Sequence, residues 1–427
     1  MSAPATIFAL SSGAPPSAIG VIRVSGPEAG AALQALAGRV PAPRRASLAS
    51  LRDAEGGLLD QALVLWFPGP DTATGEDLAE LHCHGGRAVI AAITRTLAAL
   101  PGLRPAEPGE FTRRAFANGR LDLAEAEGLA DLLAAETELQ RAAALGNLAG
   151  ALSRQVEAWR GRVLELSAGI EAVLDFSDEE DASDLPQGFT WNIVGLAAEL
   201  GEWLARPRSE RLGEGFRVVL AGPPNAGKST LFNALVESEA AITSPIAGTT
   251  RDVIERSVAI AGVPFTFVDT AGLREQGGDQ IEAIGIDRAR AALQRADLVL
   301  WLGPEGEGPG GAWEIAAQAD SPGFIAKHTA RHTLSAETGE GLADLKQALV
   351  AAAREALPKP GEAALNARQH ARLGEAAEAL AAEQHCADPL LIAEELRRAR
   401  LAFDRLIGRA TTEDMLDALF GRFCIGK

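Results

Sequence analysis

Apolar and polar positions change their period along the chain, and the first part mixes two patterns. Up to about residue 118, short apolar or alternating runs typical of strands stand beside apolar residues at helical spacing. This mixture predicts an α+β domain. The predicted strands are Thr6–Leu10, Ile19–Val24, Leu63–Phe67 and Leu78–Cys83, and the predicted helices are Ala29–Ala37 and Arg87–Leu100.

Long helical patterns occupy two separate stretches. From Leu121 to about Leu212, apolar residues recur at intervals of three and four, with a break at the acidic run Asp175–Asp184. A second helical stretch runs from Ala363 almost to the end of the chain. Because an inserted domain needs its entry and exit close together, we expect the two stretches to pack as one helical domain with another domain inserted between them.

The inserted part alternates strand and helix patterns, which predicts a parallel sheet with helical crossovers. Pro358–Gly361 is a plausible linker at its end. The predicted strands are Arg217–Ala221, Phe265–Asp269, Leu298–Leu302, Gly323–Ala326 and His332–Leu334. The expected organisation is an N-terminal domain (1–118), a first helical segment (119–212), a nucleotide domain (213–360) and a second helical segment (361–427).

The chemistry of the inserted part begins with G-x-x-x-x-G-K-S at Gly222–Ser229, between a predicted strand and a predicted helix. Glycines allow backbone N–H groups to turn towards a polyphosphate, and the helix N-terminus adds its dipole. Lys228 supplies a cation, and Ser229 offers an oxygen to Mg²⁺. This loop therefore predicts polyphosphate binding through Asn225, Ala226, Gly227, Lys228, Ser229 and Thr230.

Three further motifs follow in the order that a nucleotide switch requires. Thr249 and Thr250 stand where a switch threonine reaches Mg²⁺ and the γ-phosphate. The run Asp269-Thr270-Ala271-Gly272 ends a hydrophobic strand, which places Asp269 near a metal-bound water and Gly272 near the γ-phosphate. Ser335-Ala336-Glu337 matches a loop that packs on guanine. Together these motifs predict a GTPase.

Two departures from the usual GTPase pattern affect this prediction. Leu273 follows the aspartate motif, so the glutamine that aligns water in many GTPases is missing. The base motif N-K-x-D is interpreted as Ala326-Lys327-His328-Thr329, which keeps the lysine and lacks the asparagine and the aspartate. We therefore expect weaker discrimination between GTP and ATP than in a GTPase with the full motif.

Composition narrows the class of protein further. The net charge of −18 over 427 residues opposes non-specific binding to nucleic acid or anionic membranes. Three cysteines without paired spacing predict reduced thiols and a cytoplasmic protein. We expect neither a targeting signal nor a membrane span.

The combined motifs resemble those of the tRNA modification GTPase family MnmE, also called TrmE, across essentially the whole chain. The resemblance is carried by GPPNAGKS, AGTTRD, DTAGLRE, GEDLAELHCHGG, GEFTRRAFANGRLDLAEAE and the terminal FCIGK. It implies a homodimer that works with the FAD-dependent partner MnmG, as a heterotetramer, on the wobble uridine of certain tRNAs. It further implies GTP, Mg²⁺, K⁺ and a 5-formyl- or methylene-tetrahydrofolate as one-carbon donor.

The resemblance also implies roles for particular residues. Glu282 is the candidate for orienting the attacking water, beside the catalytic candidates Lys228 and Thr250. The implied K⁺ ligands are Asn225, Ser244, Ile246 and Thr249. The implied folate-binding residues are Arg23, Glu80, Arg120 and Lys427. At the position of Arg120 the family often has lysine, which keeps the charge and changes the geometry.

Other readings of these residues remain open. Cys424 is either a reactive thiol near the one-carbon site or a small buried apolar residue. His82-Cys83-His84 is either a metal site or, as we prefer, part of a polar pocket wall. At the level of the whole protein, an RNA-associated or ribosome-assembly GTPase without one-carbon chemistry, or a nucleotide-binding scaffold with little hydrolysis, are the alternatives.

Overall fold

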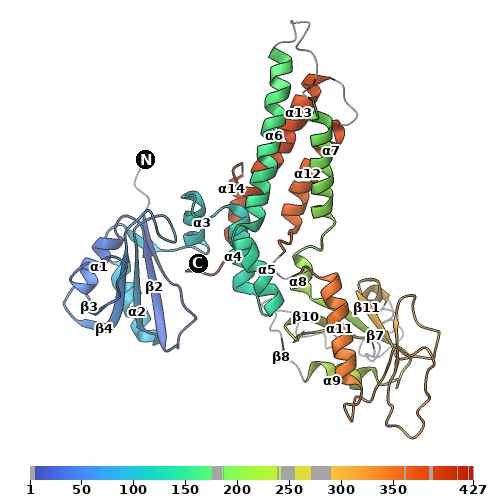
Figure 1. The fold of residues 1–427 in the computed structure, drawn as a ribbon. Helices are drawn as coiled ribbons and strands as arrows, with labels where there is room; N and C mark the ends of the chain where they lie inside the picture. Colours follow the sequence, from blue (N-terminus) through green and yellow to red (C-terminus); the bar gives the residue numbers. More distant parts are fainter. Residues whose placement is uncertain are drawn as a thin grey trace, which may run out of the picture. The chain divides into compact units, whose positions relative to one another are not determined.

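The computed structural model describes residues 5–175, 185, 187–237, 240–241, 255–270, 290–359, 362–383, 388–410, 412–421 and 423–426. Its contacts divide the chain into two compact units. One unit combines Met1–Ala130 with Asp404–Lys427, and the other is Asp131–Phe403. Figure 1 shows the elements of both units along the chain.

A six-stranded sheet forms the centre of the first unit, in the order β3-β4-β5-β2-β1-β6. All neighbouring strands are antiparallel except β1 and β6. Helices α1 (Ala29–Ala37) and α2 (Arg87–Ala98) supply apolar residues to a core shared with one face of this sheet. The strands are β1 (Thr6–Leu10), β2 (Ile19–Ser25), β3 (Ser47–Arg52), β4 (Leu58–Phe67), β5 (Leu78–His84) and β6 (Leu103–Pro105).

The end of the chain returns to this unit. Helix α14 (Glu413–Phe420) packs with α3 (Glu110–Ala117) and α4 (Leu123–Ala134) around Phe420 and Phe423. Beyond it, Ile425 forms a β-bridge with Pro108. Gly426 has a φ of +96° and lies against the carbonyl of Leu10, where a β-carbon would collide. Only glycine fits this position, where the last described residues lie close to the end of β1.

The second unit contains a helical part built from both sides of the inserted sheet. Its helices are α6 (Ala151–Asp175), α7 (Phe189–Leu204), α12 (Ala367–Glu383) and α13 (Pro389–Ile407). Measured between ring centroids, the buried Trp159 on α6 lies 5.2 Å from Trp203 on α7 and 5.9 Å from Phe403 on α13. The predicted packing of the two helical stretches against each other is therefore confirmed.

A seven-stranded sheet with the order β13-β12-β11-β7-β10-β9-β8 makes up the rest of this unit. The central strand β7 is parallel to both of its neighbours, as predicted for a sheet with crossovers. Helices α9 (Lys228–Val236) and α11 (Leu342–Ala356) contribute to its main core. The strands are β7 (Phe216–Ala221), β8 (Ala240–Ala241), β9 (Glu255–Ile260), β10 (Val263–Asp269), β11 (Leu298–Trp301), β12 (Trp313–Ala316) and β13 (His332–Thr333).

The same core includes three residues from outside the predicted nucleotide domain: Leu139, Ala143 and Leu212. Helix α5 (Glu138–Leu148) contributes Leu139 and Ala143, and the backbone N–H of Leu139 donates to the carbonyl of Gly262 at 3.1 Å. The short helix α8 (Glu210–Glu214) lies at the start of β7. The core of the sheet thus extends into the segment assigned from sequence to the helical domain.

One predicted strand is wrong. Residues 323–326 form no strand, and the strand next to β11 is β12, ten residues earlier in the sequence. Residues 302–312 connect these two parallel strands without a helix, and this segment is rich in glycine and proline. Gly303 and Gly308 lie against the ring of Trp301, whose indole N–H donates to the carbonyl of Pro304. The sequence pattern of apolar and polar residues also did not predict β3, β6, β8 and β9, which are short or alternate irregularly between apolar and polar residues.

Within the part of the chain that the structure describes, no helix combines the length and the apolar content needed to cross a membrane.

Candidate functional site

The phosphate-binding motif forms a tight loop between β7 and α9. Gly222 has a φ of +148°, and a β-carbon there would lie 3.0 Å from the backbone nitrogen of Gly303. Gly227 has a φ of +85° at the start of the helix. Both positions therefore need glycine for conformation, and the first needs it for space as well.

The lysine and the serine that follow this loop already have defined partners. The ammonium group of Lys228 donates to the carbonyls of Pro223 at 2.7 Å and Gly222 at 3.0 Å, and the residue is only 5% exposed. The hydroxyl of Ser229 donates to Oδ2 of Asp269 at 2.6 Å. The end of the predicted strand at Asp269 and the predicted phosphate loop are therefore in contact. Thr270 fixes the end of β10 through a 2.8 Å bond to the carbonyl of Leu220.

Oxygen donors at this position suit a hard divalent cation. Ser229 and Asp269 present a hydroxyl and a carboxylate beside a helix N-terminus, which is the donor set that Mg²⁺ prefers. Of the implied K⁺ ligands, Asn225 lies on the loop with a φ of +62°. Seven predicted residues of this site lie outside the described residues: Ser244, Ile246, Thr249, Thr250, Ala271, Gly272 and Glu282.

A second loop, residues 317–320, follows β12 and contacts both the phosphate loop and the loop that contains Ser335. Gln318 has a φ of +59°, and its side-chain amide packs on Gly227 and donates to the carbonyl of Asn225 at 3.4 Å. The N–H of Ala319 donates to the carbonyl of Leu334 at 3.1 Å. The buried Ser335 stabilises its own turn, because its hydroxyl accepts from the N–H of Thr338.

This loop changes the interpretation of the base motif. Its sequence A-Q-A-D keeps the final aspartate of N-K-x-D, and Asp320 is exposed there. Lys327, in contrast, donates to the carbonyl of Ile315 at 2.7 Å and pairs with Glu314 at 3.3 Å. We therefore move the motif from residues 326–329 to residues 317–320, which still lack its asparagine and lysine. The expectation of weaker guanine discrimination stays a prediction. An aspartate four residues after an alternating W-E-I-A run was the available signal.

The first unit carries a separate polar group on the sheet face opposite α1 and α2. Arg23 on β2 stands across from Glu80 on β5, and Oε1 of Glu80 accepts from Nη2 of Arg23 at 2.9 Å. Oε2 of Glu80 lies 3.1 Å from Nε2 of His82. Burial acts to raise the pKa of Glu80, but the bonds from His82 and Arg23 outweigh it and leave that pKa lowered.

Two of the predicted folate residues, Arg23 and Glu80, are thus in direct contact. Arg120 has another partner, since its Nη2 lies 2.9 Å from Oδ1 of Asp71 on an exposed surface. Lys427 lies outside the described residues. Sequence reasoning did not single out Glu76, which accepts from the hydroxyl of Ser25 at 2.8 Å and pairs with Arg114 at 3.0 Å.

The cysteines and histidines of this unit do not form one cluster. Cys83 is buried on the helix-covered face, and its burial raises the pKa of the thiol to about 11. His84 lies 2.8 Å from Asp60. No group of three metal-ligating side chains occurs among the described residues. Cys424 is exposed, so its interpretation as a buried apolar residue is wrong.

Comparison with known proteins covers almost the whole chain. The family model for the GTP-binding protein TrmE N-terminus matches residues 6–120, and that for the MnmE helical domain matches residues 123–424. The G domain of the FeoB iron transporter of T. maritima is 24% identical over 32% of this chain and 98% of its own, with a TM-score of 0.23.

Full-length relatives are much more similar. A tRNA modification GTPase MnmE from Erythrobacter litoralis is 68% identical over 99% of this chain and 100% of its own length. Another from Novosphingobium aromaticivorans is 65% identical over 99% of both chains. The chain belongs to the MnmE (TrmE) family of tRNA modification GTPases.

Proposed function

We propose that this protein is a GTP hydrolase that acts in the modification of the wobble uridine of tRNA. The observation that carries the proposal is the contact between Ser229 and Asp269 beside the Lys228 loop. It brings a cation, a hydroxyl and a carboxylate to the N-terminus of α9, where a triphosphate with Mg²⁺ finds complementary charges. The full-length similarity to tRNA modification GTPases connects this site with tRNA.

In the nucleotide reaction, the groups of this chain act by binding and orienting. Lys228 exchanges its loop carbonyls for oxygens of the β- and γ-phosphates, and Ser229 contributes a metal ligand. Asp320 accepts the N–H donors of guanine. Mg²⁺ bound at Ser229 would neutralise charge on the phosphates, and Asn225, Ser244, Ile246 and Thr249 would hold a K⁺ that adds a further positive charge there. Glu282 orients the attacking water.

In the tRNA reaction, the first unit binds the one-carbon donor, a 5-formyl- or methylene-tetrahydrofolate. The pair Arg23 and Glu80 supports this role, because it places a cation and a carboxylate together on one sheet face. Arg120, Lys427 and Cys424 complete the proposed set. The proposed assembly is a homodimer that joins the flavoprotein MnmG to add an aminomethyl or carboxymethylaminomethyl group at C5 of the uridine.

Coupling between the two reactions depends on the movement of the nucleotide domains. GTP and K⁺ bring the nucleotide domains of the dimer together, and hydrolysis separates them. The helical part transmits this movement, since packed helices can shift as units. A crosslink between nucleotide domains that forms equally with and without nucleotide would contradict this mechanism.

Phosphate release by the full chain tests the first step. We expect faster release in K⁺ than in Na⁺, and loss of activity in Lys228→Ala. Lys359→Ala, which removes the same charge from an exposed position after α11, is the matched control. Equal rates in the two salts would contradict the role of K⁺, and full turnover by Lys228→Ala would contradict the site.

Two further measurements separate this proposal from a ribosome-assembly GTPase. Cells that lack the protein should contain wobble uridine without the aminomethyl-type group, and the purified chain should bind 5-formyl-tetrahydrofolate. Normal nucleosides together with no folate binding would favour the alternative.

A further inference from the structure

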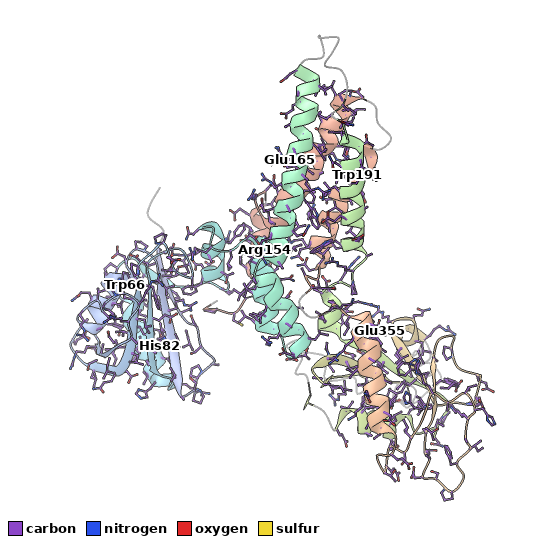
Figure 2. All side chains as sticks on the ribbon, viewed as in Figure 1. Trp66, His82, Arg154, Glu165, Trp191 and Glu355 are labelled. Atoms are coloured by element: carbon purple, nitrogen blue, oxygen red, sulfur yellow. The ribbon has the colours of Figure 1, made fainter. Side chains whose placement is uncertain are left out.

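His82 lies on the same sheet face as Arg23 and Glu80, in the sheet of the first unit shown in Figure 2. Residues at alternate positions of a strand share a face, so Glu80 and His82 of β5 are neighbours. The side chains of His82 and Glu80 are 32% and 17% exposed, so solvent or a ligand reaches both only in part.

Glu80 divides its two carboxylate oxygens between Arg23 and His82. Oε1 accepts from both Nε and Nη2 of Arg23, at 3.2 and 2.9 Å. Arginine–carboxylate pairs are frequently bidentate, with one N–H group on each oxygen. Here Oε2 faces His82 instead, at 3.1 Å. Since Glu80 stays ionised, Nε2 of His82 must carry the hydrogen that it shares with Oε2.

Counting lone pairs shows what this arrangement leaves available. A carboxylate offers about four acceptor positions. Arg23 takes both positions on Oε1, and His82 takes one on Oε2. One acceptor position on Oε2 therefore remains for an incoming N–H group. If His82 were absent, Oε2 could turn to Arg23 and close a bidentate pair; acceptor positions would still remain, but the one whose direction His82 sets would no longer point the same way.

We propose that His82 is a positioning residue that keeps one oxygen of Glu80 free from Arg23, so that this oxygen accepts an N–H donor of a pterin-type ring. The inference rests on the proposed binding of a tetrahydrofolate by this unit and adds a residue to that site. His82 acts through Glu80 and does not itself need to touch the ligand.

The neighbouring strands support a flat, partly apolar ligand at this place. Across β4, Leu65 pairs with Glu80 and Leu63 with His82, and Val21 stands beside His82 on β2. Leu63 is 46% exposed, although it lies within a sheet. Apolar side chains on both sides of a single hydrogen-bonding group suit a heteroaromatic ring that carries its donors on one edge.

The test is equilibrium binding of 5-formyl-tetrahydrofolate to the full chain. We expect His82→Leu to weaken binding roughly tenfold, because a hydrogen bond to the ligand is lost when Oε2 turns away. His82→Gln, whose side-chain amide can still donate to Oε2, should bind within about twofold of the wild type, as expected for loss of one hydrogen-bond geometry with the donor retained. His84→Leu, on the same strand and face but bonded to Asp60, is the matched control and should bind normally.

The outcomes separate the inference from the proposed function. Wild-type binding with equal affinity in His82→Leu and His82→Gln would overturn the role of His82 alone. Absence of binding in the wild type would overturn the folate site itself. If His82→Leu fails to fold, His82→Asn serves instead: its amide is too short to reach Oε2, and it should bind more weakly than His82→Gln. Equal binding by these two amides would contradict the inference.

Discussion

Replacing Asp320 by asparagine should change the nucleotide preference of the protein. The two side chains have the same shape, and the loop is fixed by the backbone bond from Ala319 to Leu334, so the fold should not change. The carboxylate accepts two N–H donors of guanine in our proposal, whereas the amide offers one acceptor and one donor. Because a hydrogen bond to a charged group contributes about 1.5–3 kcal/mol, the loss should be about 2–4 kcal/mol, or roughly 30- to 1,000-fold in Kd.

The assay is competition binding of GTP, ATP and xanthosine triphosphate to the wild type and to Asp320→Asn. Xanthine carries a carbonyl where guanine carries an amino group, so the asparagine amide should favour it. The contrasting variant is Lys327→Ala, which leaves Glu314 without its mostly buried partner and should lower the unfolding temperature. It should keep the ratio of GTP to ATP affinity. A changed ratio in Lys327→Ala, with GTP affinity unchanged in Asp320→Asn, would refute our assignment of the base loop.

Three other predictions concern the first unit. Burial acts to raise the pKa of Glu110, but the hydrogen bonds from Arg104, Arg114 and the backbone of Glu107 outweigh it and lower that pKa. The contribution of Glu110 to stability is therefore complete at neutral pH and is lost as the pH falls through this lowered value. Glu110→Gln should therefore unfold at a lower temperature at pH 7 and show a flatter acid dependence; parallel acid curves would contradict this. At pH 8, peptide mapping after alkylation should find Cys424 modified and Cys83 protected, because burial raises the pKa of the Cys83 thiol to about 11; modification of both at one rate would count against it. Gly426→Ala should release the C-terminal tail, detected as faster digestion by carboxypeptidase; unchanged digestion would show that the tail tolerates a β-carbon there.

The local motifs of the site could be predicted from the sequence, and its long-range partners could not. The phosphate loop is one continuous segment, so its residues define its geometry through glycine conformation and a helix start. Asp320 was missed because the preceding connection contains no helix, and the strand was placed ten residues too late. The family resemblance placed Arg120 with Arg23 at the folate site, which stays a prediction; the partner observed for Arg120, Asp71, comes from a distant loop.

The fold as a whole was easier to predict than its boundaries. Helical spacing on both sides of the insertion indicated the helical part, because Trp159 and Phe403 lie on clear apolar stripes. Nothing in the spacing of Leu139 distinguishes a residue that packs on a neighbouring helix from one that packs on a sheet.

The backbone bond between Leu139 and Gly262 has a practical consequence for work on isolated fragments. A fragment cut at residue 213 would lack α5 and would expose the sheet residues that Leu139 and Ala143 cover. Such a fragment should aggregate more readily than one that begins before Thr137, the residue that caps α5. Kinetic values measured on the shorter fragment would then describe a damaged sheet instead of the intact enzyme.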